Sequence, residues 1–212
     1  MANLTVPRLS LTTTTFAYHE LQAEMQGLPW TALEQAPWKD EFPYQPAVAF
    51  QIGHTDTDLY LHYAVEENTL RGQYSHSNEA VWTDSCVEFF ISFDGKKNYY
   101  NLEFNILGTG LVGYGTAVKA DRNRLSADDI EQVHTLTSIV RQADKKRWNI
   151  ILKIPVSLFS ATGLHSFAGI QADANFYKCG DELPEPHFVA WNNIDNPSPN
   201  FHLPEFFGSL EF

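Results

Sequence analysis

Residues 86–107, CVEFFISFDGKKNYYNLEFNIL, are the stretch that decides the fold. Apolar and polar side chains alternate in both halves, and the four residues DGKK at 94–97 are typical of a β-hairpin turn. This loop pairs Phe93 with Asn98 in antiparallel register. Because successive side chains of a strand point to opposite faces, one apolar set must face the core. We expect that set to be Val87, Phe89, Ile91, Leu102, Phe104 and Ile106.

Segments with the same period of two occur on both sides of this hairpin. Short helical turns are expected at 127–132 and 155–161, and a charged turn at 143–146. Strands at regular spacing, with turn residues between them, indicate an all-β fold, a sandwich of two antiparallel sheets. Besides the hairpin, we expect strands at residues 48–52, 59–65, 111–118, 133–141, 147–154, 167–176 and 188–191, and a short one near Leu210.

The chain is predicted to form a single domain, residues 1–212. Its length, with 43% hydrophobic and 14% aromatic residues, allows a sizeable core, and all-β domains of about 200–250 residues are common. We find no internal repeat, linker or low-complexity tract that would divide the sequence. Residues 1–45 are expected to be an irregular segment packed on the domain, because prolines such as Pro29, Pro37 and Pro43 exclude long helices there.

The net charge and the composition limit the classes of binding partner and the cellular compartments that we expect for this protein. A formal net charge of −12 disfavours phosphate backbones and anionic lipid surfaces, so we expect no nucleic acid and no membrane insertion. The two cysteines, Cys86 and Cys179, are expected to be free thiols rather than a disulfide. Residues 1–15 lack the apolar core of a signal peptide. We therefore expect a cytoplasmic protein if the chain is complete, and a secreted or periplasmic one if a signal peptide was removed.

The second face of the hairpin is polar. The register places Glu88 opposite Glu103, with Asn101 and Asn105 flanking Glu103 on the same face. Directly opposed residues have Cβ atoms about 4.5–5.5 Å apart, and like charges there destabilise the pair. We expect a cation, a shared proton or a polyhydroxy ligand to compensate. The alternative is a solvated face with a lysine or arginine nearby.

Aromatic and amide residues occur on both sides of this polar face in the sequence. Sugar binding requires aromatic platforms for weakly polar C–H faces and polar side chains for the hydroxyl rims. Trp82 precedes the hairpin directly, and residues 193–201 form a second segment rich in amide and aromatic side chains. If both segments reach the polar face, aromatic rings would stand beside Glu88, Asn101 and Glu103.

Three motifs resemble family 9 carbohydrate-binding modules, and the similarity extends from about Trp30 onward. They are WTDSCVEFF at residues 82–90, NLEFN at 101–105 and NFHLPEFFG at 200–208. The resemblance implies a β-sandwich in which two aromatic rings hold a sugar, often at the reducing end of a glycan. It implies also that structural calcium is possible, without assigning ligands to residues.

The resemblance also implies roles for particular residues. Trp82 and Phe201 would be the two rings, with Phe201 a smaller platform than the tryptophan of the family. Glu88 matches an acidic position and Asn101 an amide position, whereas Glu103 stands where the family can carry an arginine. That change replaces a donor with an acceptor. His202 is a further candidate donor to a sugar hydroxyl, and Asn105 completes the predicted polar set.

A glycoside hydrolase that uses Glu88 and Glu103 is the alternative function. Their inferred separation resembles the roughly 5–5.5 Å of retaining enzymes. Two neighbours on one sheet face would, however, approach a glycosidic bond from the same side. A third possibility is a structural or accessory domain of a polysaccharide-degrading enzyme. We favour a non-catalytic module that binds a mono- or oligosaccharide, with no certain cofactor.

Overall fold

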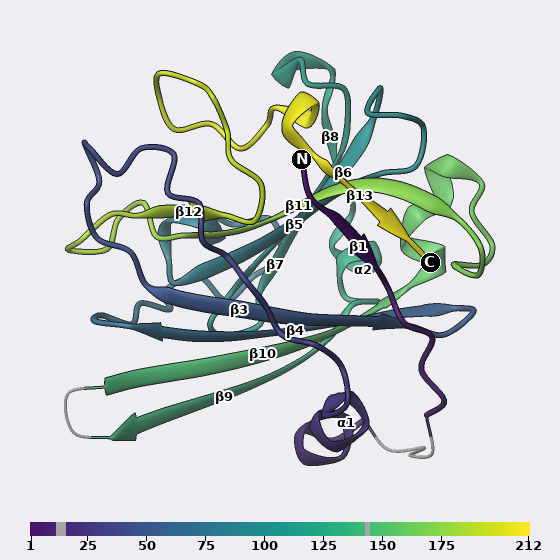
Figure 1. Ribbon diagram of the computed structural model, residues 1–212, viewed down its shortest axis with the longest axis horizontal. Coiled ribbons are helices and arrows are strands. Elements are labelled where there is room, and N and C mark those ends of the chain that lie inside the picture. Colours follow the sequence, from purple (N-terminus) through teal and green to yellow (C-terminus); the bar gives the residue numbers. More distant parts are fainter. Residues whose placement is uncertain (12–15, 143–144) are drawn as a thin grey trace.

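The computed structural model describes residues 1–11, 16–142 and 145–212 and contains two stacked β-sheets (Figure 1). Neighbouring strands are antiparallel, except that β1 pairs with β13 in parallel. The larger sheet contains, in spatial order, β1 (Asn3–Thr5), β13 (Gly208–Glu211), β11 (Gln171–Cys179), β5 (Cys86–Ser92), β6 (Tyr99–Asn105), β7 (Gly110–Gly115) and β8 (Asn123–Arg124), with β12 (Phe188–Ala190) paired to β11. The smaller sheet contains β2 (Thr31–Ala32), β3 (Ala47–His54), β4 (Asp58–Glu67), β10 (Lys145–Pro155) and β9 (His134–Gln142).

The sheets pack face to face around one aromatic and aliphatic core. The predicted register of β5 and β6 is confirmed, with Phe89 opposite Leu102 and Glu88 opposite Glu103. All six residues expected on the core face of this hairpin are buried. Phe176 of β11 stacks on Phe50 of the smaller sheet at 3.9 Å and on Phe89 at 4.9 Å between ring centroids. This stack of three rings therefore joins the two layers.

Each strand expected from the sequence has a counterpart, although some bounds differ. β11 begins at Gln171 rather than at residue 167, because a turn precedes it in which Gly169 has a φ of 72°. Cys179, which lies beside Gly180 in the sequence, is the last residue of β11 rather than part of a turn. Both cysteines are buried free thiols, as predicted. The predicted turn at 143–146 lies partly outside the described residues.

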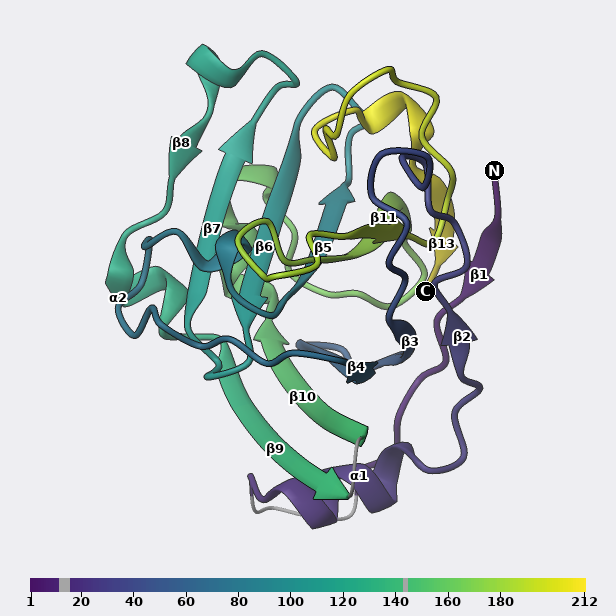
Figure 2. The same ribbon diagram turned by 90° about the vertical axis from the view of Figure 1, so that its left-hand side faces the viewer.

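The first 45 residues contain more regular structure than predicted. Besides β1 and β2, helix α1 spans Tyr18–Met25 and lies on the outer face of the smaller sheet (Figures 1 and 2). Leu21 and Met25, four residues apart, share one side of this helix and pack toward Ile151. The prolines exclude long helices, but the stretch before Pro29 leaves room for two turns.

The remaining helical structure is short. The second helix, α2, spans Ala127–Ile130, and the Ser126 side chain caps it by accepting from the Asp129 N–H. Four 3₁₀ turns lie at Val81–Thr83, Lys119–Asp121, Val156–Thr162 and Pro204–Phe206. None of the helices in the described part of the chain has the length and hydropathy needed to cross a bilayer.

A fully buried ion pair ties the two sheets together at one end. The Lys178 ammonium of β11 lies 2.9 Å from a Glu67 carboxylate oxygen of β4, and both side chains are 0% exposed. Trp148 Nε1 donates to the other Glu67 oxygen at 2.7 Å. Lys178 also donates to His187 Nε2 at 2.7 Å. Burial, together with Lys178, lowers the pKa of His187 to about 3, so this imidazole is neutral and can accept.

Removing one member of this pair should destabilise the fold strongly. Lys178→Met leaves the Glu67 carboxylate buried without its cation, which costs about 3–5 kcal/mol of unfolding free energy. Urea denaturation followed by tryptophan fluorescence measures the loss. Lys153→Met, which breaks the partly exposed pair with Asp58, should cost about 1 kcal/mol or less. Adding Glu67→Gln to Lys178→Met should recover part of the loss. Equal stability of Lys178→Met and wild type would contradict the assignment.

Candidate functional site

A cavity of about 610 Å³ lies on the outer face of the larger sheet. Its floor is formed by β5, β6, β7 and the end of β11, which contribute Glu88, Asn101, Glu103, Gly113 and Cys179. One wall comes from the connection between β7 and β8, and another from the C-terminal segment around residues 199–202. In Figure 2 these two segments, drawn in teal and in yellow, extend beyond the same end of the sheet and are separated from each other.

Six of the seven residues predicted from the sequence line this cavity: Trp82, Glu88, Asn101, Glu103, Phe201 and His202. They come from two parts of the chain that are far apart in sequence, the β5–β6 hairpin with the turn before it and the C-terminal segment, and the fold brings the two together. The structure does not place Asn105 there. Its amide donates to Tyr74 O and to Asp84 Oδ2, and its Oδ1 accepts from two backbone N–H groups. Asn105 shares the face of Glu103, but the segment around Tyr74 covers it, so its role is to hold that segment.

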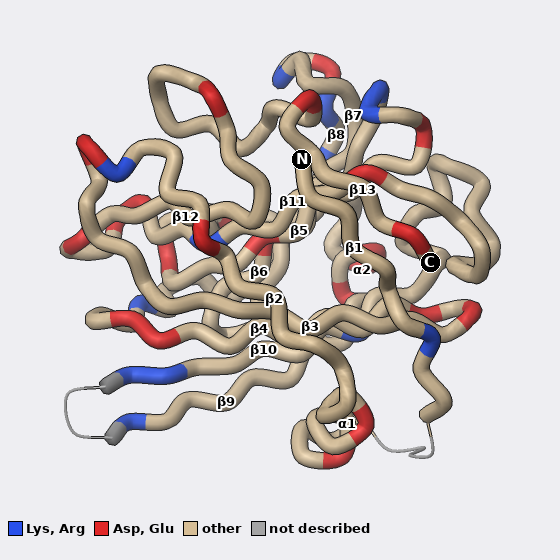
Figure 3. The backbone as a smooth tube through the Cα atoms, viewed as in Figure 1, with Lys and Arg blue, Asp and Glu red and all other residues tan. Residues whose placement is uncertain are grey.

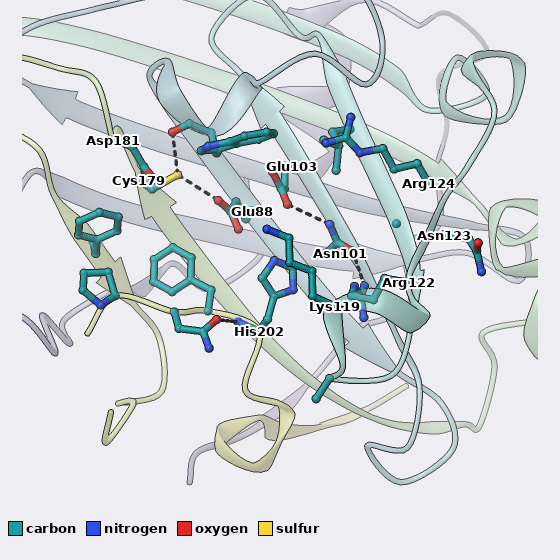
Figure 4. A pocket seen from close by; sticks show the side chains of 18 residues that line it. Glu88, Asn101, Glu103, Lys119, Arg122, Asn123, Arg124, Cys179, Asp181 and His202 are labelled. Carbon is teal, nitrogen blue, oxygen red and sulfur yellow. Dashed lines mark hydrogen bonds between the residues drawn. The ribbon is translucent and has the colours of Figure 1, made fainter. Parts of the chain in front are cut away.

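The opposed carboxylates of Glu88 and Glu103 are both buried, with exposures of 4% and 5%. Glu88 Oε1 accepts a hydrogen bond from Cys179 Sγ at 3.0 Å, and Glu103 Oε1 accepts one from Asn101 Nδ2 at 2.9 Å (Figure 4). Within the described residues, no lysine or arginine forms an ion pair with either carboxylate. Arg122 and Arg124 act on Glu103, and Lys178 acts on Glu88, only from beyond ion-pair distance.

The carboxyl groups respond to this environment by retaining protons. Burial raises the pKa of Glu103 to about 7. Burial, reinforced by the charge of Glu103, raises the pKa of Glu88 well above its ordinary value. The floor of the cavity thus offers hydroxyl donors as well as carboxylate acceptors near neutral pH.

Basic side chains form the wall opposite this acidic floor, in the connection that Figure 3 shows in blue near β8. Arg122 donates to the Gly115, Thr116 and Tyr99 carbonyl oxygens and to Asn101 Oδ1. Its guanidinium carbon lies 3.9 Å from the Tyr99 ring centroid. Arg122 thereby orients Asn101, whose amide nitrogen then faces Glu103. Lys119 extends from the same connection toward the middle of the cavity (Figure 4).

The two predicted aromatic platforms occupy different walls. Trp82 lies in the 3₁₀ turn before β5, and its carbonyl accepts from the Asp181 N–H at 3.3 Å. Phe201 stacks on Tyr177 with centroids 4.1 Å apart and planes at 8°, so one of its faces is covered. Among the described rings, Trp82 and Phe201 make no contact with each other, although both border the cavity.

Several residues that line the cavity were not singled out by the sequence. Cys179, Asp181 and Phe188 reach it from the end of β11 and from β12. The basic residues of the β7–β8 connection belong to the run KADRNR at 119–124, which no period-two pattern marks. That charged run between two strands was the one available signal. Its partners across the cavity depend on how the chain folds.

Comparison with protein families identifies the chain. Residues 19–212 match carbohydrate-binding family 9. The chain belongs to this family. Family 9 comprises non-catalytic carbohydrate-binding modules, so the hydrolase alternative is set aside. The position of Glu88 and Glu103 on one face of one sheet agrees with this, because neither can act from the opposite side of a bond.

Solved structures support the family assignment. A candidate carbohydrate-binding protein from Bacteroides uniformis ATCC 8492 is 35% identical, with a TM-score of 0.91 and coverage of 99% of this chain and 98% of that chain. A family 9 module from Caldicellulosiruptor kristjanssonii in complex with glucose is 14% identical, with a TM-score of 0.63 and coverage of 99% and 95%. The same source provides a complex with cellotriose at 15% identity, a TM-score of 0.63 and coverage of 99% and 93%. No curated protein matched the chain significantly.

The resemblance implies that a structural calcium ion is possible, but it assigns no ligands to that ion. Within the described residues, the cluster of three potential ligands consists of Cys86, Cys179 and Glu88. Calcium takes oxygen ligands, usually six to eight of them, so two thiols do not suit it. A structural calcium in this module stays a prediction.

The buried Glu103 carboxyl should make the stability of the module depend on pH. Its pKa is about 7 in the folded protein and about 4.3 when unfolded. Between these values the folded state binds more protons, so stability falls as the pH rises. Glu103→Gln cannot ionise, and from about pH 4 to about pH 8 it should lose less stability than wild type, by an amount on the order of 1–3 kcal/mol.

Urea titrations at several pH values, in the presence of a chelator, measure this difference. Glutamine retains the oxygen that accepts from Asn101, so the hydrogen bond is preserved. Glu34→Gln, at an exposed position, is the control and should follow the wild-type pH profile. Parallel profiles for Glu103→Gln and wild type would show that Glu103 ionises normally.

Proposed function

We propose that the cavity binds the end of a glycan as a mono- or oligosaccharide. The observation that carries this proposal is that sugar-binding candidates from two distant parts of the chain, the β5–β6 hairpin region and the C-terminal segment, border one cavity. Its volume of about 610 Å³ falls within the usual range for small-ligand sites, roughly 300–1,000 Å³. Membership of family 9 supports the class of ligand.

In this proposal the two aromatic side chains contact the weakly polar faces of the sugar. Trp82 is partly exposed at the rim, and Tyr177 supports Phe201 from behind. Stacking should provide most of the affinity, because each hydroxyl gives up hydrogen bonds with water and contributes only about 0.5–1.5 kcal/mol net. Phe201 is 8% exposed and also packs on Trp38 and Phe188, so it can offer a ligand at most part of one ring face.

The polar residues would hold the hydroxyl rim. Glu88, Asn101 and Glu103 present acceptors and, when protonated, donors along the floor. Tyr99 Oη lies 2.9 Å from His202 Nδ1, and burial lowers the pKa of His202 to about 4, so this ring is neutral near pH 7. In the tautomer in which Nδ1 accepts from Tyr99, Nε2 carries the proton and can donate to a sugar hydroxyl.

The ligand class that we propose is a β-glucan end, such as glucose or a short cello-oligosaccharide. Structurally similar family 9 domains from Caldicellulosiruptor kristjanssonii were solved in complex with glucose and in complex with cellotriose. Binding of this kind would serve polysaccharide degradation by keeping an attached or associated enzyme near its substrate. Calorimetry against glucose and cello-, xylo- and manno-oligosaccharides tests the ligand class directly.

Removing the exposed aromatic ring should weaken binding most. Trp82→Ala should raise the dissociation constant by about tenfold or more, equivalent to about 1.4 kcal/mol, and by more than Asn101→Ala does. The wild-type dissociation constant should lie on the order of micromolar to millimolar, because a single sugar buries little surface. Trp30→Ala is the matched control: Trp30 is 49% exposed and packs on His62 of the smaller sheet, outside the cavity. Wild-type affinity in Trp82→Ala would refute the site.

Chemical reduction of the reducing-end sugar distinguishes recognition of that end from binding to other units of the glycan chain. Borohydride converts the reducing-end ring of cellotriose into an open polyol, which has no flat face to stack between aromatic side chains. If the module holds the reducing end, the affinity for reduced cellotriose should fall by about tenfold or more. Equal affinities for the two trisaccharides would instead indicate an internal or non-reducing unit as the ligand.

A further inference from the structure

Two thiols and a carboxyl group converge at the floor of the cavity. Cys86 and Cys179 are directly opposite each other on β5 and β11, and Glu88 lies two residues after Cys86 on the same face. The two Sγ atoms and one carboxylate oxygen of Glu88 lie within 4.8 Å of one another, and all three residues are buried. Within the cluster, Cys179 Sγ lies 3.0 Å from Glu88 Oε1.

This cluster has access to solvent through the cavity. Cys179 and Glu88 both line the cavity, whereas Cys86 lies behind them and is 0% exposed. An ion that enters from the cavity would meet the Glu88 carboxylate and the Cys179 thiol before it meets Cys86. The cavity side also leaves a position for a fourth ligand. Three protein ligands with one open position are typical of zinc sites that retain a water molecule.

The acidic floor next to the cluster favours a cation, although Lys119, Arg122 and Arg124 line another wall of the same cavity. Glu103 stands directly opposite Glu88, and no lysine or arginine in the described residues is ion-paired with either. Lys178, the neighbour of Cys179, belongs to the other face of β11 and is committed to Glu67 and His187. A divalent cation between the thiols and Glu88 would relieve the repulsion between the two carboxylates.

The donor set selects the kind of metal. Thiolate sulfur suits zinc and other thiophilic ions, whereas calcium and magnesium require oxygen. We propose that Cys86, Cys179 and Glu88 form a binding site for a thiophilic divalent cation of the zinc class at the floor of the cavity. On binding, each thiol and the protonated Glu88 carboxyl release a proton to solvent, the two sulfur atoms and one Glu88 oxygen bind the metal, and a water molecule from the cavity fills the fourth position.

Cobalt(II) is the probe, because it replaces zinc and reports its ligands by absorption. The full-length protein, stripped with a chelator and kept reduced with a phosphine, is titrated with Co²⁺ in the absence of sugar. We expect one equivalent to bind, with a sulfur-to-cobalt charge-transfer band and the strong visible bands of a tetrahedral site. One equivalent of Zn²⁺ should remove these bands. Binding without the charge-transfer band, or no stoichiometric binding, would overturn the proposal.

Variants then identify the ligands. Cys179→Ser should abolish or strongly reduce the charge-transfer band, and Glu88→Gln should weaken Co²⁺ binding by about tenfold or more. Asp181→Asn is the control, since Asp181 also lines the cavity but lies outside the cluster, and it should retain the band and the stoichiometry. Circular dichroism verifies that each variant is folded. If Cys179→Ser does not fold, the charge-transfer band of the wild-type protein still tests whether sulfur binds the metal. An unchanged band in folded Cys179→Ser would refute the site.

The metal titration is independent of the sugar-binding proposal. It uses no carbohydrate, so a failure to bind cobalt would leave the glycan site untouched. Conversely, the module could bind cobalt at one equivalent and no sugar. Calorimetry with glucose, performed on the stripped and on the zinc-loaded protein, reports the two properties separately.

Discussion

The antiparallel register between β5 and β6 is the constraint on which the rest of the structure depends. Pairing Phe89 with Leu102 directs apolar side chains into the sandwich, and the same pairing places Glu88 opposite Glu103 on the outer face. A slip of one residue would expose the core aromatics and bury the carboxylates among them. One face of the β5–β6 pair therefore contributes to the core and the other forms part of the cavity floor. A change of register would alter both faces at once.

Buried ionisable groups are stabilised in two different ways in this molecule, by an ion pair and by protonation. At one end of the sandwich, Lys178 and Glu67 compensate each other, and Trp148 and His187 supply further hydrogen bonds. At the cavity, Glu88 and Glu103 face each other without a cation and retain protons instead. An ion pair with both partners in place holds two layers together. The two opposed carboxyl groups instead line the cavity, where protonation removes their mutual repulsion.

The two sheets also differ in what covers their outer faces. Helix α1 packs on the smaller sheet through Leu21 and Met25 and covers part of its outer face. The larger sheet is instead flanked by the β7–β8 connection and the C-terminal segment, which leave a hollow between them. Arg122 stabilises the first of these walls through three carbonyl oxygens and orients Asn101 at the same time. The shape of the cavity thus depends on connections rather than on strands.

The sequence by itself determined the longer strands, the register of the central hairpin and the polar face with Glu88, Asn101 and Glu103, but not the short strands β1, β2 and β8. This was possible because a period of two and a four-residue turn are local properties. The resemblance to family 9 added Trp82 and Phe201, which no local pattern links. Only the tertiary structure decided that another segment covers Asn105 whereas Glu103 lines the cavity. It also decided that Cys179 and Arg122 reach the same cavity. These outcomes depend on how distant connections pack over a sheet face, and alternation along a strand carries no information about what covers it.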